Sequence, residues 1–85
     1  MGDPLLIRVS FYSYCRDLAG VDETRVAVPE GKTLAGLMTQ LYSTHPRLRA
    51  LDKSLLLAVG VEYQTREYVL RPGDEVALFP PVQGG

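Results

Sequence analysis

The chain has 85 residues, which suits one domain spanning residues 1–85 with a single core, and its 9 Lys and Arg against 10 Asp and Glu give a formal net charge of −1. This near balance argues against nucleic acid as the main partner, since that normally calls for a basic face, and no run of like charges or long apolar segment indicates contact with a membrane. Cys15 is the single cysteine, so no internal disulfide forms, and with no recognisable secretory leader we expect a cytoplasmic protein.

Two strands are predicted in the N-terminal part of the chain. Apolar and polar residues alternate from Leu5 to Tyr14, which is the period of two of a half-buried strand. RDLAG, residues 16–20, then predicts a short turn that ends on a glycine able to take a positive φ. A second alternating run covers residues 23–28 and ends at Pro29, so the two strands are predicted to form a hairpin.

A helix is predicted next, within EGKTLAGLMTQLYSTHP, residues 30–46. Thr33 suits the N-cap, and the pair His45-Pro46 ends the helix. Gly36 inside it costs about 1 kcal/mol relative to alanine and suggests close packing of the helix on a sheet. The apolar residues recur at the spacing of one helix face: Leu34, Leu37, Met38, Leu41 and Tyr42.

The rest of the chain predicts further strands. The apolar run 55–61 is typical of a strand in the middle of a sheet. Residues 63–70 predict a short hairpin or an edge strand. RPGDE, residues 71–75, is a strong turn signal, because a proline fixes one φ and the following glycine permits a positive one. Residues 76–79 then predict the last strand.

This order of elements predicts an α+β fold. One main helix can cover only one face of the sheet, so the core has two layers. The sheet of four to five strands is predicted to be mixed, because the first pair is a hairpin and the helix joins strands that can run parallel. Residues 80–85 follow the last strand directly and are predicted to form a flexible tail.

Side chains that could catalyse a reaction or bind a metal are scarce. No Gly-rich phosphate loop, HExxH, GxSxG or CxxC motif occurs. His45 is the single histidine and is expected to be solvated or to cap the helix end, and Cys15 is expected to pack or to be exposed without a role, with a persulfide on it as the alternative. Asp74-Glu75 is assigned to the turn. We therefore expect no metal, no bound cofactor and no active site made of side chains.

The C-terminal residues supply a different reactive group. Gly84 and Gly85 allow the chain to enter a narrow channel in another protein, because no Cβ clashes with its walls. Pro80 and Pro81 stiffen the exit toward an extended course. The tip is an α-carboxylate with an ordinary pKa of about 3.5, and such a poor electrophile requires activation, most simply by ATP to an acyl-adenylate. The alternative is a frayed end without a function.

Two segments resemble one known family. PGDEVALFPPVQGG, residues 72–85, resembles the C-terminal signature of the small subunit of molybdopterin synthase, the MoaD family. IRVSFYSYCRDLAG, residues 7–20, resembles the first strand and the RxLxG-type turn of the same family. One departure is Gly60, where the family usually has asparagine. The resemblance implies a ubiquitin-like β-grasp fold, in which one main helix packs on the mixed sheet.

The same resemblance implies a sulfur carrier in molybdenum cofactor biosynthesis. An E1-like enzyme would use ATP to adenylate the Gly85 carboxylate, and a sulfurtransferase would convert it to a thiocarboxylate. The tail would then enter the active site of the large subunit of molybdopterin synthase (MoaE-like) and donate its sulfur to a cyclic pterin precursor. Two carriers would be used per product, within a heterotetramer, and the catalytic side chains would belong to the large subunit.

Residues that bind these partners are predicted from the tail and from the strand alternation. The first strand places Tyr12 and Tyr14 opposite its core residues, and Leu78 and Phe79 point to opposite faces of the last strand. An exposed aromatic cluster beside the tail suits an interface, with a core that wraps round the sheet edge as the alternative. The predicted site consists of Gly85 as the reacting residue and of these binding residues: Tyr12, Phe79, Pro80, Pro81, Val82, Gln83 and Gly84.

Three other functions stay open at this point. A thiamine-type sulfur carrier shares the fold and the Gly-Gly thiocarboxylate, although FPPV before the glycines favours molybdopterin synthase. A ubiquitin-like protein modifier would use the same adenylated glycine to form isopeptide bonds with lysines. A plain interaction domain would have an inert terminus, and removal of Gly85 would leave its function intact.

Overall fold

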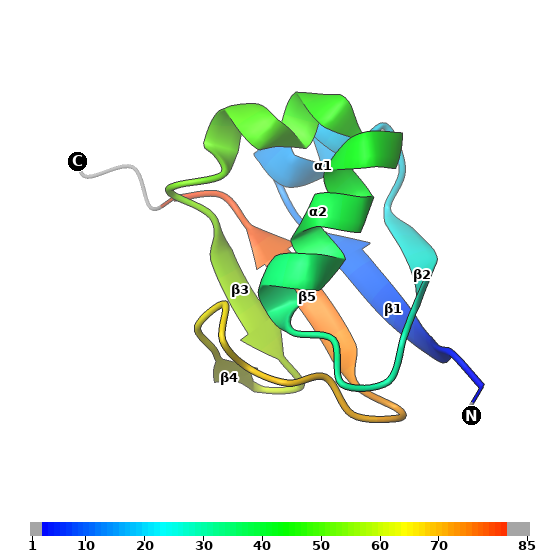
Figure 1. The fold of residues 1–85 in the computed structure, drawn as a ribbon. Helices are drawn as coiled ribbons and strands as arrows, with labels where there is room; N and C mark the ends of the chain where they lie inside the picture. The colour runs from blue at the N-terminus through cyan, green and yellow to red at the C-terminus, as the bar shows by residue number, and fades with distance from the viewer. Residues whose placement is uncertain (1–2, 82–85) are drawn as a thin grey trace.

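The computed structural model describes residues 3–81 as helices packed on one sheet (Figure 1). In chain order the elements are β1 (Leu5–Phe11), α1 (Tyr14–Ala19), β2 (Glu23–Val28), α2 (Leu34–Thr44), the 3-10 helix η1 (Pro46–Leu51), β3 (Leu56–Val59), β4 (Glu62–Tyr63) and β5 (Glu75–Phe79). The predicted α+β class is confirmed, with α2 as the main helix across the sheet.

β5, the last strand, lies at the centre of the sheet. The strand order is β2-β1-β5-β3-β4. β1 and β5 are parallel and the other pairs are antiparallel, so the predicted mixed sheet is confirmed. β3, predicted for the middle of the sheet, has neighbours on both sides but lies one strand from the edge. The chain beyond Phe79 therefore leaves from the middle of the sheet.

The predicted apolar stripe of α2 forms one side of the core. All five of its residues are buried, namely Leu34, Leu37, Met38, Leu41 and Tyr42. Thr33 is the N-cap as predicted, because its side chain accepts a hydrogen bond from the Gly36 amide at 3.3 Å. The prediction for Gly36 is not met: a Cβ there would meet the flexible side chain of Lys32, and no sheet residue is among its nearest neighbours.

The prediction of a short turn at RDLAG is wrong, because residues 16–19 belong to α1, whereas the positive φ predicted for Gly20 is confirmed. The helix is six residues long and ends at Gly20, whose φ of 80° and amide hydrogen bond to the Arg16 carbonyl form a left-handed C-cap. Cys15 and Leu18 are its buried residues. A helix with two inward residues is too short to show a helical period in the sequence.

The segment between β3 and β5 is mostly irregular. The predicted edge strand exists, but β4 covers only Glu62–Tyr63. The turn before it contains Gly60 at a φ of 63°, a left-handed conformation that asparagine also adopts, which accounts for the departure from the family pattern. Further along, the carbonyls of Arg66 and Tyr68 accept hydrogen bonds from the first amides of α2, so this loop fastens the start of the helix.

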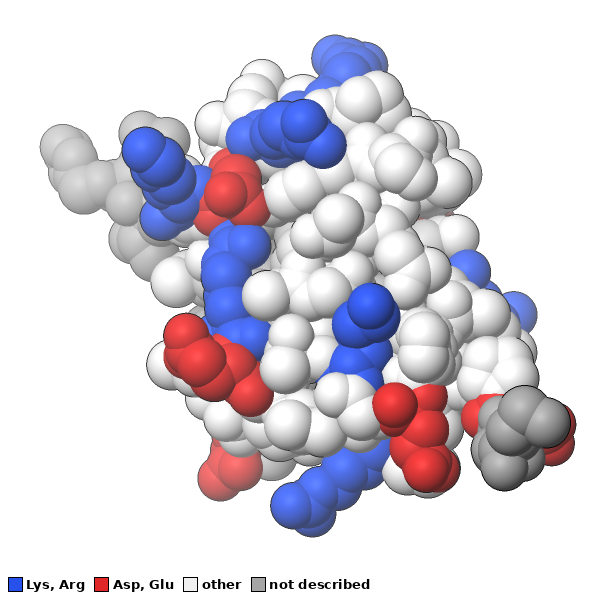
Figure 2. All heavy atoms as spheres, in the orientation of Figure 1, with Lys and Arg blue, Asp and Glu red and all other residues white. Residues whose placement is uncertain are grey.

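The two faces of the sheet differ in character. Residues of β5 alternate, with Val76 and Leu78 buried toward the helices and Phe79 on the opposite, uncovered face. Figure 2 shows the side that carries α2, where basic and acidic side chains are interspersed with uncharged ones and no broad area has one sign. The uncovered face is therefore the better candidate for a docking surface.

Candidate functional site

The predicted site begins where β5 ends. β5 is held by β1 on one side and β3 on the other, so the position of Phe79 at its end is fixed by both neighbours. Pro80 and Pro81 follow and are half-buried. The predicted residues Val82, Gln83, Gly84 and Gly85 lie outside the described part of the chain.

Phe79 is the middle member of an exposed aromatic cluster, made of Tyr12, Tyr63 and Phe79. The Tyr12 and Phe79 rings are stacked, with centroids 4.8 Å apart and planes 9° apart. Tyr63 meets the other side of this pair edge-on, 6.3 Å from the Phe79 centroid. Tyr12 is 47% exposed and Tyr63 is 68% exposed. Aromatic pairs favour such stacked and edge-on arrangements. Together the three rings leave a broad apolar surface in contact with water.

Three separate segments hold this aromatic cluster together. The Tyr12 amide donates to the Leu78 carbonyl at 3.1 Å, which extends the β1–β5 pairing by one residue. Leu56 of β3, itself partly exposed, is the register partner of Phe79. The prediction of Tyr12 and Phe79 is confirmed as a contact, whereas Tyr63 was not predicted. The sequence signal for Tyr63 was the two-residue turn before β4, because this turn folds β4 back on β3 and pairs Tyr63 with Ala58 on the uncovered face.

The expectation that Tyr14 shares the strand face of Tyr12 is wrong. β1 ends at Phe11, and Ser13 turns the chain into α1 with a φ of 52°. Ser13 is the one non-glycine residue with a positive φ among residues 3–81, a conformation that costs about 1–3 kcal/mol. Tyr14 instead lines a pocket of about 360 Å³ with Ser13, Leu51, Pro80 and Pro81. The start of the predicted tail thus borders the same pocket as residues of α1 and η1.

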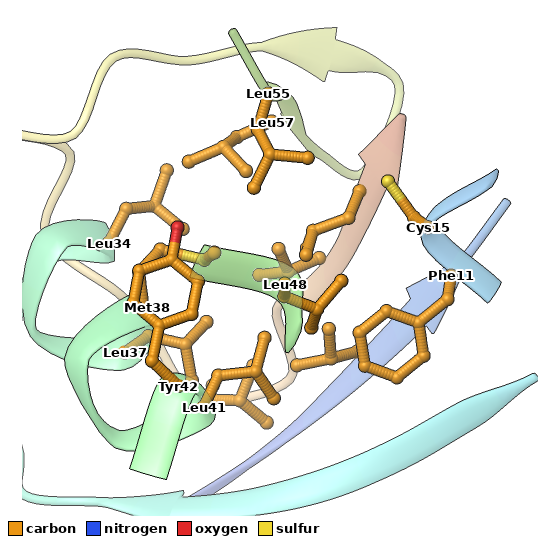
Figure 3. Close-up of a cluster of buried hydrophobic side chains, with 14 of the residues drawn as sticks. Phe11, Cys15, Leu34, Leu37, Met38, Leu41, Tyr42, Leu48, Leu55 and Leu57 are labelled. Atoms are coloured by element: carbon orange, nitrogen blue, oxygen red, sulfur yellow. The ribbon is translucent and has the colours of Figure 1, made fainter. Parts of the chain in front are cut away.

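Cys15 and His45 take the passive roles expected of them. Cys15 is buried among core side chains that include Phe11 and Leu48 (Figure 3), and burial raises the pKa of its thiol to about 11. A buried neutral thiol is a poor nucleophile, which weighs against a persulfide there. His45 is the C-cap of α2, and its ring lies 5.7 Å from that of Phe11.

A polar network holds Asp52, the residue that follows η1. The hydroxyl of Tyr42 donates to Asp52, and Arg66 binds the same residue through its carboxylate at 2.9 Å and its backbone carbonyl. The hydrogen bond from Tyr42 and the charge of Arg66 lower the pKa of Asp52, while burial and Asp52 raise the pKa of Tyr42 to about 12. Leu51, which precedes Asp52, lines the pocket.

Replacement of Asp52 by asparagine is expected to lower the free energy of unfolding by about 1 kcal/mol at pH 7, a modest value because the carboxylate is partly exposed and screened. Its pKa is lower in the folded chain than in the unfolded chain. The ionised carboxylate therefore stabilises the fold at pH values above its ordinary pKa of about 3.9. This contribution disappears as the pH falls through the lower pKa that the group has in the folded chain. Urea denaturation at pH 7 and at pH 2 should show a difference between the two proteins only at pH 7. An equal difference in the free energy of unfolding at both pH values would contradict a stabilising role of the ionised Asp52 carboxylate.

Neither a metal site nor a membrane segment is found within residues 3–81. This part of the chain has no group of three or more His, Cys, Asp and Glu side chains placed to bind a metal ion. Its helices are too short or too polar to cross a bilayer. What the described site offers is a binding surface, made of the aromatic cluster next to the exit of the chain from β5.

Comparison with known proteins gives a family. A family model described as the ThiS family matches residues 9–85. The molybdopterin synthase sulfur carrier subunit of Chlamydomonas reinhardtii is 35% identical over 82 residues, which cover 93% of this chain and 98% of the relative. The subunit of that name from Escherichia coli is 38% identical over 82 residues, which cover 94% of this chain and 100% of the relative.

Among solved structures, small archaeal modifier protein 1 (SAMP1) from Haloferax volcanii has a TM-score of 0.84 at 26% identity, covering 94% of this chain and 99% of that one. This likeness, together with the mixed five-stranded sheet and its main helix, confirms the predicted ubiquitin-like β-grasp fold. The chain belongs to the ThiS family.

Proposed function

We propose that this protein is the sulfur carrier subunit of a molybdopterin synthase. The observation that carries the proposal is the match, over nearly the full length of both chains, to relatives that bear this name in an alga and a bacterium. The segment FPPV that precedes the two glycines favours this carrier over the thiamine-type carrier.

In the proposed reaction the Gly85 carboxylate attacks the α-phosphate of ATP on an E1-like enzyme, releasing pyrophosphate and forming an acyl-adenylate. Sulfur at the oxidation level of sulfide, supplied through a sulfurtransferase, then displaces AMP, and the chain ends in a thiocarboxylate. This chemistry needs no acid, base or metal from the carrier, which fits a chain whose described part offers a binding surface instead. The reduced Cys15 fits a cytoplasmic location.

The partner that we propose for the aromatic cluster is the large subunit of the synthase. Tyr12, Tyr63 and Phe79 offer rigid apolar area with little side-chain entropy to lose, which is typical of interface centres. The cluster lies at the end of β5, so a protein that covers it is close to Pro80, the next residue of the chain. Two carriers and two large subunits would form the heterotetramer.

A second candidate function is covalent protein modification. It is favoured by the TM-score of 0.84 with SAMP1, a protein called a small archaeal modifier. Both functions begin with the same acyl-adenylate. They differ in the nucleophile that follows, which is sulfur for a carrier and a lysine amine for a modifier.

Intact mass spectrometry of the protein purified from its own host tests the proposal. A carrier is expected to show a population heavier by the mass difference between sulfur and oxygen, and the shift should disappear when Gly85 is deleted. Conjugates with other proteins through the same glycine would instead identify a modifier. A mass that stays unshifted after incubation with the E1-like enzyme, ATP and a sulfurtransferase would overturn the carrier.

A further inference from the structure

β2 is an edge strand with an open side. It pairs with β1 alone and forms one border of the sheet (Figure 1). The Phe11 amide donates to the Asp22 carbonyl at 2.8 Å, so the backbone groups of Asp22 face β1. Because these groups alternate along an antiparallel strand, those of Glu23, Arg25 and Ala27 face away from the sheet. Their side chains are exposed, so an incoming strand meets no obstacle from them.

The helix covers one end of this edge. The side-chain amide of Gln40 donates to the Ala27 carbonyl at 3.0 Å, which occupies the outward acceptor at that position. The backbone of Glu23 and Arg25 has no such cover within residues 3–81. The open part of the edge is therefore a short stretch around Thr24, and a partner strand that reached Ala27 would have to displace Gln40.

Of the two charged side chains on this stretch, one has an oppositely charged partner and the other has none within residues 3–81. Arg8, opposite Arg25 in the β1–β2 register, is paired with Glu23 at 3.0 Å and with Glu75 at 3.7 Å. Arg25 has no acidic partner in the part of the chain that the structure describes, and its neighbour across the strands has the same sign. Charged edge strands ordinarily resist pairing with other strands. Here the signs alternate along the strand, so the resistance depends on the register.

A second copy of the same strand can approach only in a few registers. Outward backbone groups must face outward groups, so a two-fold axis can pass through Glu23, Thr24, Arg25 or Val26. An axis at Glu23 or Arg25 opposes like charges. An axis at Val26 requires the Ala27 carbonyl that Gln40 holds.

An axis through Thr24 avoids all of these conflicts. Glu23 of each copy then lies opposite Arg25 of the other, and Thr24 lies opposite Thr24. Opposite charges and threonine pairs are both favourable across strands. The unpaired Arg25 gains an acidic partner, and the hydrogen bond from Gln40 to Ala27 stays intact.

We propose that the open edge of β2 binds the same edge of a second copy, with the two-fold axis at Thr24. The two sheets then join into one sheet of ten strands, and β2 ceases to be an edge. The aromatic cluster is made of residues from β4, β5 and the chain after β1, so none of it lies on β2. Self-association is therefore compatible with a partner on that cluster.

Sedimentation equilibrium of the full chain tests this pairing, with two charge variants as probes. A stretch of about five residues a side buries little area, so we expect a weak dimer that is visible below about 1 mM and weakens with added salt. Arg25→Glu places an acidic side chain opposite Glu23 at both ends of the pairing and should raise the dissociation constant by roughly tenfold or more. This change removes a like-charge neighbour of Arg8, so it does not threaten the fold.

The matched control is the double variant Glu23→Arg with Arg25→Glu. This variant exchanges the two charges, so that opposite charges again face each other across the axis, and Arg8 keeps an acidic neighbour, now at position 25. Its dimer dissociation constant should therefore match that of the parent. Slowed exchange of the Arg25 amide with rising concentration would support pairing at this edge, and the two charge variants test the register. A parent that stays monomeric up to about 1 mM would overturn the proposal, and so would an Arg25→Glu variant that dimerises as well as the parent.

Discussion

Deletion of Gly85 is expected to abolish sulfur donation and to leave the fold intact. The truncated chain still ends in a glycine carboxylate, so its chemistry is unchanged and only its reach is shortened by one residue, roughly 3.5 Å. A partner channel that positions the reacting atom would not tolerate such a displacement, which can cost a hundredfold or more in rate. Sulfur transfer to the acceptor, measured with the E1-like enzyme, sulfurtransferase and large subunit present, should fall to background.

Two comparisons keep this result from being read as misfolding. The free energy of unfolding should change by less than about 0.5 kcal/mol, because every core residue of the described part of the chain is kept. Gly85→Ala keeps the length and the carboxylate but adds a Cβ, so it should transfer sulfur more slowly than the parent and faster than the deletion. Undiminished transfer by the shortened chain would rule out Gly85 as the residue that carries the sulfur.

Replacement of Phe79 by alanine should have the next largest effect, a loss of affinity for the large subunit of roughly thirtyfold. This corresponds to about 2 kcal/mol, the scale of a central aromatic residue at an interface. Phe79 lies between Tyr12 and Tyr63, so its removal takes away the ring against which both tyrosines rest. Isothermal titration calorimetry with the purified large subunit measures the change directly.

Leu6→Ala is a suitable control for this experiment. Leu6 is 63% exposed at the other end of β1, on the same uncovered face and away from the aromatic cluster. Its replacement should leave the affinity within about twofold of the parent value. Equal affinities for the parent and for a folded Phe79→Ala variant would exclude the aromatic cluster as the docking surface.

The sequence was sufficient for those elements whose periodicity extends over several residues. β1 and α2 each expose a repeated pattern, because one side of the element faces the core and the other faces water. The turn at residues 71–75 was predicted equally well, since Gly73 has a φ of 85° there. In these places local chemistry and tertiary packing require the same residues.

The sequence did not predict α1, η1 or the contribution of Tyr63. α1 depends on a positive φ at Ser13, a residue type that does not signal one. Tyr63 joins the aromatic cluster because β4 folds back on β3 and β3 in turn pairs with β5, and no periodic pattern records this second, long-range pairing. In the predicted site, Tyr12 and Phe79 followed from strand alternation, whereas their third partner required the three-dimensional fold.

The central place of β5 has a mechanical consequence. A partner that holds the C-terminal end and moves away pulls along the strand axis. The load then falls at once on the pairings of β5 with β1 and with β3, which run alongside each other and resist sliding together. An edge strand under the same pull would share the load with one neighbour only. The C-terminal end of β5 is thus anchored on both sides against a pull along the strand.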